Sequence, residues 1–386
     1  MNAIRIVTII CWVVVGIVLL GLAGWFLTGT VLGARPAWLD RHTPFRIGIG
    51  GFEALAGPFN VVGEHSADPS GINSISVDWV AGEITIMPHA GSEIQITELA
   101  QRELDDDERF SINISGGTLD IRFVANNVRG LMRQMPQKRL EVLVPRSLSE
   151  NLDSLNVDSV SGGVNVDGMS IARLDVGTTS GAIELSNLTS QSLDANSTSG
   201  RIVATSVRAE DMSLSSTSGA VAVTSSQAGE MDIGTLSGAI RVSGASAGEI
   251  DLDSTSGAVS ASGAFDRVSL NSLSGAISLD NSAVRTVVNA ESTSGTLSLS
   301  GEFYSVAANT LSGGISVRSA IVPASLNLRS TSGSLRLTVP NEGPVTVSHS
   351  STSGRFNSEL PVIMHGADAQ FVFSTLSGNT SIFELE

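Results

Sequence analysis

Aspartate side chains recur at one outward position of a repeated unit, and their spacing could support two kinds of chemistry. They are Asp175, Asp194, Asp232 and Asp251, with Asp253 two positions after the last. Neighbouring carboxylates can share a Ca²⁺ ion, which takes about 6–8 oxygen ligands, so Asp232, Asp251 and Asp253 are weak calcium candidates. Two converging acids could instead cleave a glycosidic bond. We favour a hydrated acidic stripe, because no aromatic side chain lies beside these residues to stack on a sugar.

Other residue types give no sign of a catalytic or cofactor site. The five histidines are scattered without metal-ligand spacing, and His349 falls at an inward position typical of a core or edge residue. The single cysteine, Cys11, can form neither a disulfide within the chain nor a cysteine metal site. No nucleophile or phosphate-binding motif occurs in a strand–helix context. We therefore predict a protein that is not an enzyme and has no cofactor or small-molecule substrate.

The charge pattern limits the possible partners. A net charge of −16 argues against nucleic acid, because phosphate binding needs clustered basic residues. One basic cluster could contact an anionic membrane surface, although a plain cap segment leading into the repeats is the interpretation that we favour. Its members are Arg122, Arg129, Arg133, Lys138, Arg139 and Arg146.

A Ser-Gly pair marks the repeat that must position all of these residues. The spacing between successive glycines is 19 residues five times, then 18, 20, 18, 20, 21 and 24. Such a period indicates a stack of similar units, none of which can bury its apolar side alone. The glycines are Gly162, Gly181, Gly200, Gly219, Gly238, Gly257, Gly275, Gly295, Gly313, Gly333, Gly354 and Gly378.

Apolar residues alternate with polar ones on both sides of each glycine. In one unit, Leu174 and Val176 precede Gly181, and Ile183 and Leu185 follow it. Alternation with period two predicts strands, and the loss of one residue of phase at the Ser-Gly pair predicts a bend. Glycine can adopt the positive φ that such a bend often needs.

The serine and threonine residues before the glycine are predicted to be structural. Hydroxyl groups both donate and accept hydrogen bonds, so equivalent residues could bond along the stack without any catalytic role. In the most regular units the structural residues are Ser161, Gly162, Ser180, Gly181, Ser199, Gly200, Ser218, Gly219, Ser237, Gly238, Ser256 and Gly257.

The predicted fold is all-β: a parallel β-solenoid of twelve regular coils of about 19 residues, preceded by one N-terminal transmembrane α-helix. We expect an anchor over 1–35, a linker over 36–72, an irregular β cap over 73–150 and the solenoid over 151–386. Four phenylalanines gather within 345–386 and predict a bulkier C-terminal cap. Right-handed coils are favoured, because parallel crossovers strongly prefer that hand.

An apolar run without charges extends from Ile6 to Ala34 and predicts the membrane anchor. A membrane-spanning helix needs about 20 apolar residues. A cleaved signal peptide is the alternative, but its apolar region is usually only about 7–15 residues long. The arginines that follow the run favour a cytoplasmic solenoid under the positive-inside rule, yet long domains often cross regardless of charge. We expect a single-pass protein of the cell membrane with an extracytoplasmic solenoid.

The sequence resembles a bacterial family, DUF4097, whose members are described as adhesins. The resemblance rests on the strand Leu140–Pro145, which ends in Val-Pro, followed by the Ser-Gly repeats that begin near Leu155. It covers about residues 73–386. It implies a β-solenoid, a bacterial source and an envelope location, and it supplies no catalytic residues.

Three functions remain open from the sequence. The preferred hypothesis is a non-enzymatic, membrane-anchored envelope protein that uses its solenoid for adhesion, envelope assembly or stress sensing, with an envelope polymer or protein as partner. The first alternative is a cytoplasmic, membrane-tethered scaffold. The second is a polysaccharide-active β-helix enzyme that depends on Asp232, Asp251 or Asp253.

Overall fold

The computed structural model describes residues 59–106, 108–123, 138–364 and 370–385. These residues belong to one compact unit. The predicted anchor over 1–35, and the predicted linker as far as residue 58, lie outside the described residues. Within the described part of the chain, no helix is both long and apolar enough to cross a membrane.

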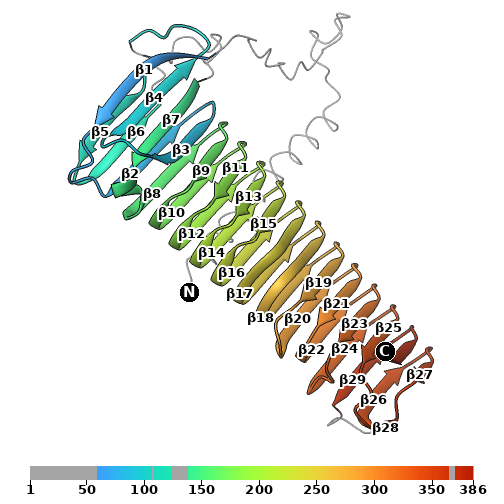
Figure 1. Cartoon of the computed structure of the whole chain (residues 1–386). Helices are drawn as coiled ribbons and strands as arrows, with labels where there is room; N and C mark the ends of the chain where they lie inside the picture. The colour runs from blue at the N-terminus through green and yellow to red at the C-terminus, as the bar shows by residue number, and fades with distance from the viewer. Residues whose placement is uncertain (1–58, 107, 124–137, 365–369, 386) are drawn as a thin grey trace, which may run out of the picture. The chain divides into compact units, whose positions relative to one another are not determined.

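The unit is an all-β parallel solenoid of about eleven turns with almost no helix (Figure 1). Each coil contributes a first strand before the Ser-Gly pair and a second strand after it. The first strands are β8 (Leu152–Ser159), β10 (Ser170–Thr178), β12 (Thr189–Ser197), β14 (Arg208–Ser216), β16 (Gln227–Thr235), β20 (Thr286–Ser292), β22 (Phe303–Thr310) and β24 (Ser325–Ser330).

The second strands are β9 (Val164–Asp167), β11 (Ile183–Ser186), β13 (Ile202–Thr205), β15 (Val221–Thr224), β19 (Ile277–Asn281), β21 (Leu297–Gly301), β23 (Ile315–Ser319) and β25 (Leu335–Val339). In the middle of the stack, the second strand of one coil continues into the first strand of the next. The continuous strands are β17 (Ile240–Ser254) and β18 (Val259–Ser272).

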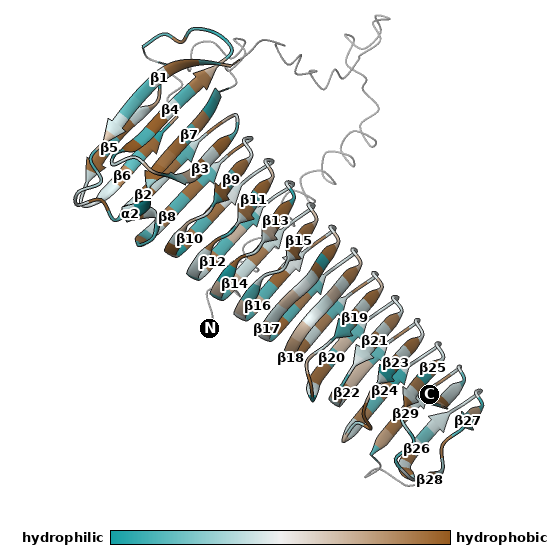
Figure 2. Ribbon diagram, in the orientation of Figure 1, coloured by the Kyte–Doolittle hydropathy of each residue, from teal (hydrophilic) through white to brown (hydrophobic). Residues whose placement is uncertain are grey.

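The core lies between the two sheets and follows the predicted alternation. Leu174 and Val176 on β10, and Ile183 and Leu185 on β11, are all buried. Their equivalents in successive coils pack into one continuous cluster, so hydrophobic and hydrophilic bands alternate along each strand (Figure 2). In-register parallel pairing, such as Leu174 with Leu193, places each inward residue directly against its equivalent.

The glycine of each corner is needed for close approach rather than for a positive φ. The corner glycines are absent from the residues with positive φ, so that part of the prediction was wrong. A Cβ atom on Gly181 would lie 1.7 Å from the carbonyl oxygen of Gly162, and one on Gly200 would lie 1.7 Å from that of Gly181. No other residue fits, because a carbon and an oxygen cannot approach so closely.

The corner hydroxyl groups bond to the backbone and not to one another. The N–H of Gly200 donates to Ser197 Oγ at 2.7 Å, and Ser216 Oγ donates to the carbonyl of Gly200 at 3.3 Å. Nearer the surface, Ser199 Oγ donates to the carbonyl of Thr179 at 3.2 Å. Ser216 and Ser199 therefore fasten their corners to the preceding coil through backbone carbonyl groups, and not through hydroxyl groups bonded to one another along the stack.

The far end of the stack departs from chain order. The strands there are β26 (Val345–Ser351), β27 (Phe356–Ser358), β28 (Val362–Met364), β29 (Phe371–Thr375) and β30 (Thr380–Glu384). Strand β29 pairs with β24 on one side and β26 on the other, and β30 lies in the same way between β25 and β27. The coil of β29 and β30 is thus interior, and the irregular coil of β26, β27 and β28 ends the rod.

This exchange corrects two expectations. The stack makes about eleven turns and ends in a short irregular coil, not in a twelfth regular one. Phe371 and Phe373 are fully buried inside the stack, whereas we expected them to cover its end. Phe356 lies at the end, where its ring centroid is 5.1 Å from that of His349.

The near end shows the same exchange and carries an added antiparallel layer. Its elements are β1 (Asn60–Ala67), β2 (Ser74–Trp79), β3 (Ile84–His89), β4 (Ile94–Ala100), β5 (Ser111–Ser115), β6 (Thr118–Arg122), β7 (Lys138–Pro145) and the short helix α2 (Arg146–Ser149). The coil of β2 and β3 lies between that of β6 and β7 and that of β8 and β9. Antiparallel pairing of β5 with β6, and of β4 with β7 and β1, covers the outermost edges.

Candidate functional site

The outward side of the first-strand sheet, here called the first-strand face, carries the predicted aspartates. Parallel register places Asp175 beside Asp194 and Asp232 beside Asp251. Asp253 projects from the same face, beside Gly234 of the adjacent coil. The equal spacing of 19 residues in this part of the chain produces this register. Carboxylates therefore occur on this face as neighbouring pairs at the strand spacing of about 4.8 Å, and Ser213 lies between the pair Asp175–Asp194 and the pair Asp232–Asp251.

Partial burial between neighbouring side chains raises the pKa values of these aspartates. Desolvation raises the pKa of Asp175, and the nearby carboxylates of Asp194 and Asp158 add to the rise. Desolvation also raises the pKa values of Asp194 and Asp232. The first-strand face therefore holds acids that take up protons more readily than free aspartate does.

Asp251 has the largest described shift on this face. Desolvation, followed by repulsion from Asp253, raises its pKa to about 6, although a hydrogen bond from Ser269 opposes the rise. One carboxylate oxygen of Asp251 is buried without a hydrogen-bond partner. A carboxyl group with a pKa near 6 changes charge close to neutral pH, so the charge of this face depends on pH.

The aspartates do not assemble into a calcium site. Among the described residues, no three acidic, histidine or cysteine side chains come together in a group able to hold a metal ion, Asp232, Asp251 and Asp253 included. Register explains the result. Side chains on a flat parallel sheet point away from its plane side by side, so they do not converge on one point.

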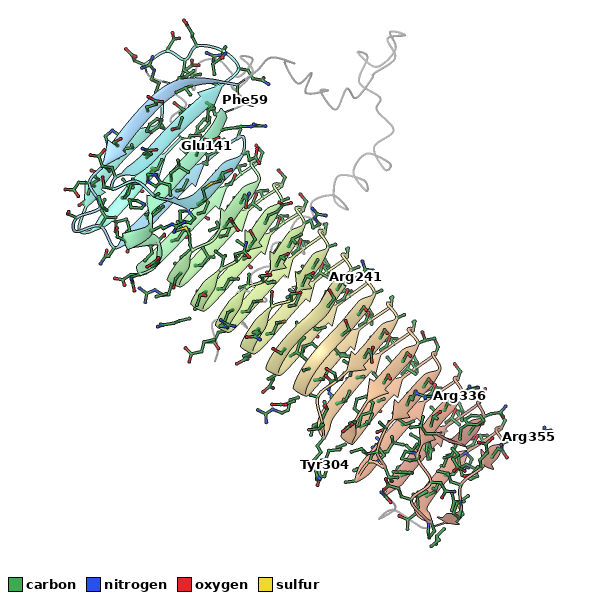
Figure 3. The ribbon with its side chains drawn as sticks, viewed as in Figure 1. Phe59, Glu141, Arg241, Tyr304, Arg336 and Arg355 are labelled. Carbon is green, nitrogen blue, oxygen red and sulfur yellow. The ribbon has the colours of Figure 1, made fainter. Side chains whose placement is uncertain are left out.

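The second-strand face, the outward side of the other sheet, carries charged residues of both signs, and the acid Glu184 on β11 is exposed there. Arg241 on β17 and Arg336 on β25 project there (Figure 3). The guanidinium of Arg336 lies 4.9 Å from the ring centroid of Phe383, which covers part of that ring.

The predicted basic cluster is divided by the fold. Lys138 is fully buried, and its Nζ lies 2.8 Å from Glu98 Oε1 in an ion pair of which neither side chain is exposed. The same ammonium lies 4.1 Å from the ring centroid of Phe123, so it stabilises the cap and is not available to a membrane surface. Arg122 bonds Asp120 at 2.6 Å on the surface. Arg129 and Arg133 lie outside the described residues.

His349 is placed where the sequence predicted, on an inward position at the end of the rod. Burial lowers its pKa, and Nε2 is buried without a hydrogen-bond partner. Burial therefore favours the neutral form of its imidazole. His42 and His365 lie outside the described residues.

A hollow at the second corner of three neighbouring coils was not predicted from the sequence. Asn187, Ser206 and Ser225 each follow a second strand and adopt positive φ values of 52°, 55° and 50°. They help to line a cavity of about 290 Å³. The signal was available in the sequence: the sixth residue after the corner glycine is Gly168, Asn187, Ser206, Ser225 or Gly244 in the first five coils, all of them turn-forming types.

Three solved structures align with much of this chain at low sequence identity. A provisionally assigned cell adhesion protein from Clostridium sporogenes is 8% identical, with a TM-score of 0.24, over 85% of this chain and 100% of its own. A provisionally assigned adhesin from Parabacteroides distasonis is 13% identical, with a TM-score of 0.28, over 86% of this chain and 98% of its own.

A provisionally assigned lipid binding protein, also from Parabacteroides distasonis, is 14% identical, with a TM-score of 0.26, over 86% of this chain and 98% of its own. These identities and TM-scores are too low to transfer any function. No curated protein matches this sequence.

The family assignment rests on the sequence of the repeats themselves. The model of the Toastrack DUF4097 family matches residues 72–264 and 249–375. These matches cover most of the chain, including the coil of β2 and β3 and the whole regular stack. The chain therefore belongs to the Toastrack DUF4097 family.

Proposed function

We propose that this protein is a non-enzymatic cell-envelope protein that presents its solenoid as an adhesive or assembly surface. Residues 6–34 anchor the chain in the membrane, and the solenoid lies outside the cytoplasm. The observation that carries the proposal is the first-strand face, where small polar side chains recur in register. Asp175 lies beside Asp194, for example, and Asn196 lies beside Ser215.

A repeated flat face suits a partner that is itself extended or repeated. Each contact on such a face is weak, but equivalent contacts on neighbouring coils act together and increase the overall affinity. The corner serines support a structural rather than a nucleophilic role for the hydroxyl groups, because Ser197 and Ser216 are bonded to the backbone of the corners. The rod therefore supplies many similar contacts and not one reaction centre.

Protease shaving of intact cells tests the location. Cells carry the full chain with a C-terminal tag, and lysed cells serve as the control for protease access. Loss of the tag from intact cells supports the extracytoplasmic placement. A tag that survives in intact cells but is digested after lysis contradicts it and favours a cytoplasmic scaffold.

A pair of matched variants tests the face. We expect Asn196→Arg with Ser215→Arg to reduce adherence of the cells to one another and to surfaces, because two long charged side chains interrupt adjacent outward positions. Ser260→Arg with Ser278→Arg makes the same change on adjacent coils of the second-strand face and is expected to leave adherence unchanged. Equal adherence of both variants and the unmodified chain would count against the first-strand face.

A further inference from the structure

The hollow at the second corner, here called the corner groove, spans three neighbouring coils, those of Gly181, Gly200 and Gly219. Its volume of about 290 Å³ is close to the lower end of ligand pockets, about 300 Å³. Its lining is mostly polar, and the side chains of Leu188 and Val207, which also line it, are almost fully buried. The polar residues are Asn187, Thr189, Ser206, Arg208, Ser225 and Gln227.

The backbone of the corner groove is strained where it lines the hollow and relaxed on either side. Gly168 and Gly244, in the flanking coils, take the same turn with φ values of 71° and 59°. Glycine adopts this left-handed conformation without steric cost, whereas a residue with a Cβ atom does not. Asn187, Ser206 and Ser225 thus carry a steric cost at the three positions that line the groove. Among the described residues other than glycine, Arg285 is the one further residue with a positive φ, and it lies outside the groove. Strain repeated at three equivalent positions of one lined hollow points to a function for those side chains.

Hydrogen bonds orient the charged and amide groups of the groove. Arg208 donates from Nε and Nη2 to Gln227 Oε1 at 3.1 and 3.0 Å, which holds the guanidinium along the wall. Asn187 Nδ2 donates to Asp167 Oδ1 at 2.8 Å, which leaves its amide oxygen as an acceptor. Ser206 and Ser225 are exposed, so their hydroxyl groups can both donate and accept.

We propose that the corner groove binds a short segment of a neutral linear polysaccharide. Hydroxyl, amide and guanidinium groups on three successive coils match the hydroxyl groups of a sugar, which both donate and accept hydrogen bonds. The strand spacing of about 4.8 Å is close to the length of one sugar unit in an extended chain, so successive coils can bind successive units. A polyanion is disfavoured, because the chain carries a net charge of −16.

This inference rests on the proposed adhesive function for its biological role, but its physical test does not depend on where the solenoid lies. The purified full chain in detergent is titrated calorimetrically with cellotetraose and with tetra-N-acetylchitotetraose, two neutral tetrasaccharides. We expect at least one of them to bind. Arg208→Ala should weaken this binding at least tenfold, and Arg267→Ala, which removes another exposed arginine from the solenoid, should leave it unchanged.

A double variant separates binding from folding. Ser206→Gly with Ser225→Gly relieves the strained turns, so we expect its melting temperature to rise while its affinity for the tetrasaccharide falls at least tenfold. Absence of binding to both sugars, or binding that Arg208→Ala does not weaken, would overturn the inference. Either result leaves the protease-shaving experiment unaffected, so failure of the groove and failure of the proposed function can be told apart.

Discussion

Substitution of one corner glycine should disrupt the stack far more than substitution of a glycine one coil away. In Gly257→Ala the new Cβ atom would lie 1.7 Å from the carbonyl oxygen of Gly238, and real Cβ contacts are essentially never under 3.0 Å. The two coils must therefore separate at this corner. In Gly234→Ala the new atom meets nothing within 4 Å, which makes it a matched control.

The expected cost follows from the bonds that join these two corners. The N–H of Ser256 donates to the carbonyl of Leu236 at 3.1 Å, that of Thr255 donates to Thr235 at 3.2 Å, and Ser254 Oγ donates to Gly238 at 3.4 Å. A hydrogen bond contributes about 0.5–1.5 kcal/mol, and a buried group left unpaired costs about 1–3 kcal/mol. We therefore expect Gly257→Ala to lower the free energy of unfolding by about 3–6 kcal/mol.

Urea denaturation of the purified chain, followed by the β-sheet circular dichroism signal, measures this difference. Gly234→Ala should remain within about 0.5 kcal/mol of the unmodified chain or become slightly more stable, because alanine loses less backbone entropy than glycine. A Gly257→Ala variant as stable as Gly234→Ala would refute the close-approach explanation of the Ser-Gly repeat.

Three further substitutions test other parts of the fold. Asp251→Asn should stabilise the protein by about 1–2 kcal/mol at pH 7 and by little at pH 4, as measured by urea titrations. The pKa of Asp251 is raised from 3.8 to about 6 in the folded protein, so the unmodified protein has the full contribution of this group below pH 3.8 and loses it as the pH rises through 6. The expected gain in stability is reduced because Asp251 is half-exposed. Lys138→Met should cost about 3–5 kcal/mol because Glu98 is left as an unpaired buried charge, and addition of Glu98→Leu should recover most of the melting temperature. Ser197→Ala should cost about 1–3 kcal/mol because the buried N–H of Gly200 loses its acceptor, and a loss no greater than that of Ser199→Ala in the same denaturation assay would contradict this role.

The regular part of the fold follows directly from local sequence. Alternating residues such as Leu174 and Val176 indicate strands, and the constant spacing places Asp175 beside Asp194. These features depend only on period and residue type, which the sequence displays. The reason for glycine at the corner could not be predicted from local sequence, because the carbonyl of Gly162 that excludes a Cβ at Gly181 comes from another coil.

The exchange of coils depends on long-range pairing, which no local pattern shows. Phe371 and Phe373 fill inward positions equally well in an interior coil or in a terminal one. A weak signal does exist at the second residue before each corner glycine. Along the rod these residues alternate as Leu311, Thr331, Leu376 and Thr352, whereas chain order would place two threonines together.

The candidate sites were predictable only in part. The aspartates of the first-strand face could be located from the sequence, but the raised pKa values of Asp175 and Asp251 depend on partial burial by neighbouring coils. The corner groove was missed because its polar residues vary from coil to coil, and only their shared backbone turn brings Asn187, Ser206 and Ser225 together.

The exchanged order at the far end has a consequence for synthesis of the chain. Residues 345–358 leave the ribosome before residues 371–384, yet they stack on the outer side of them. Coils up to β25 can be added one at a time as they emerge, but the coil of β26, β27 and β28 cannot join the stack until β29 and β30 have been made. The regular coils can therefore fold one after another during synthesis, whereas the last two coils must be added together. Until then the edges of β24 and β25 are unpaired and can be bound by a chaperone or by a second nascent chain.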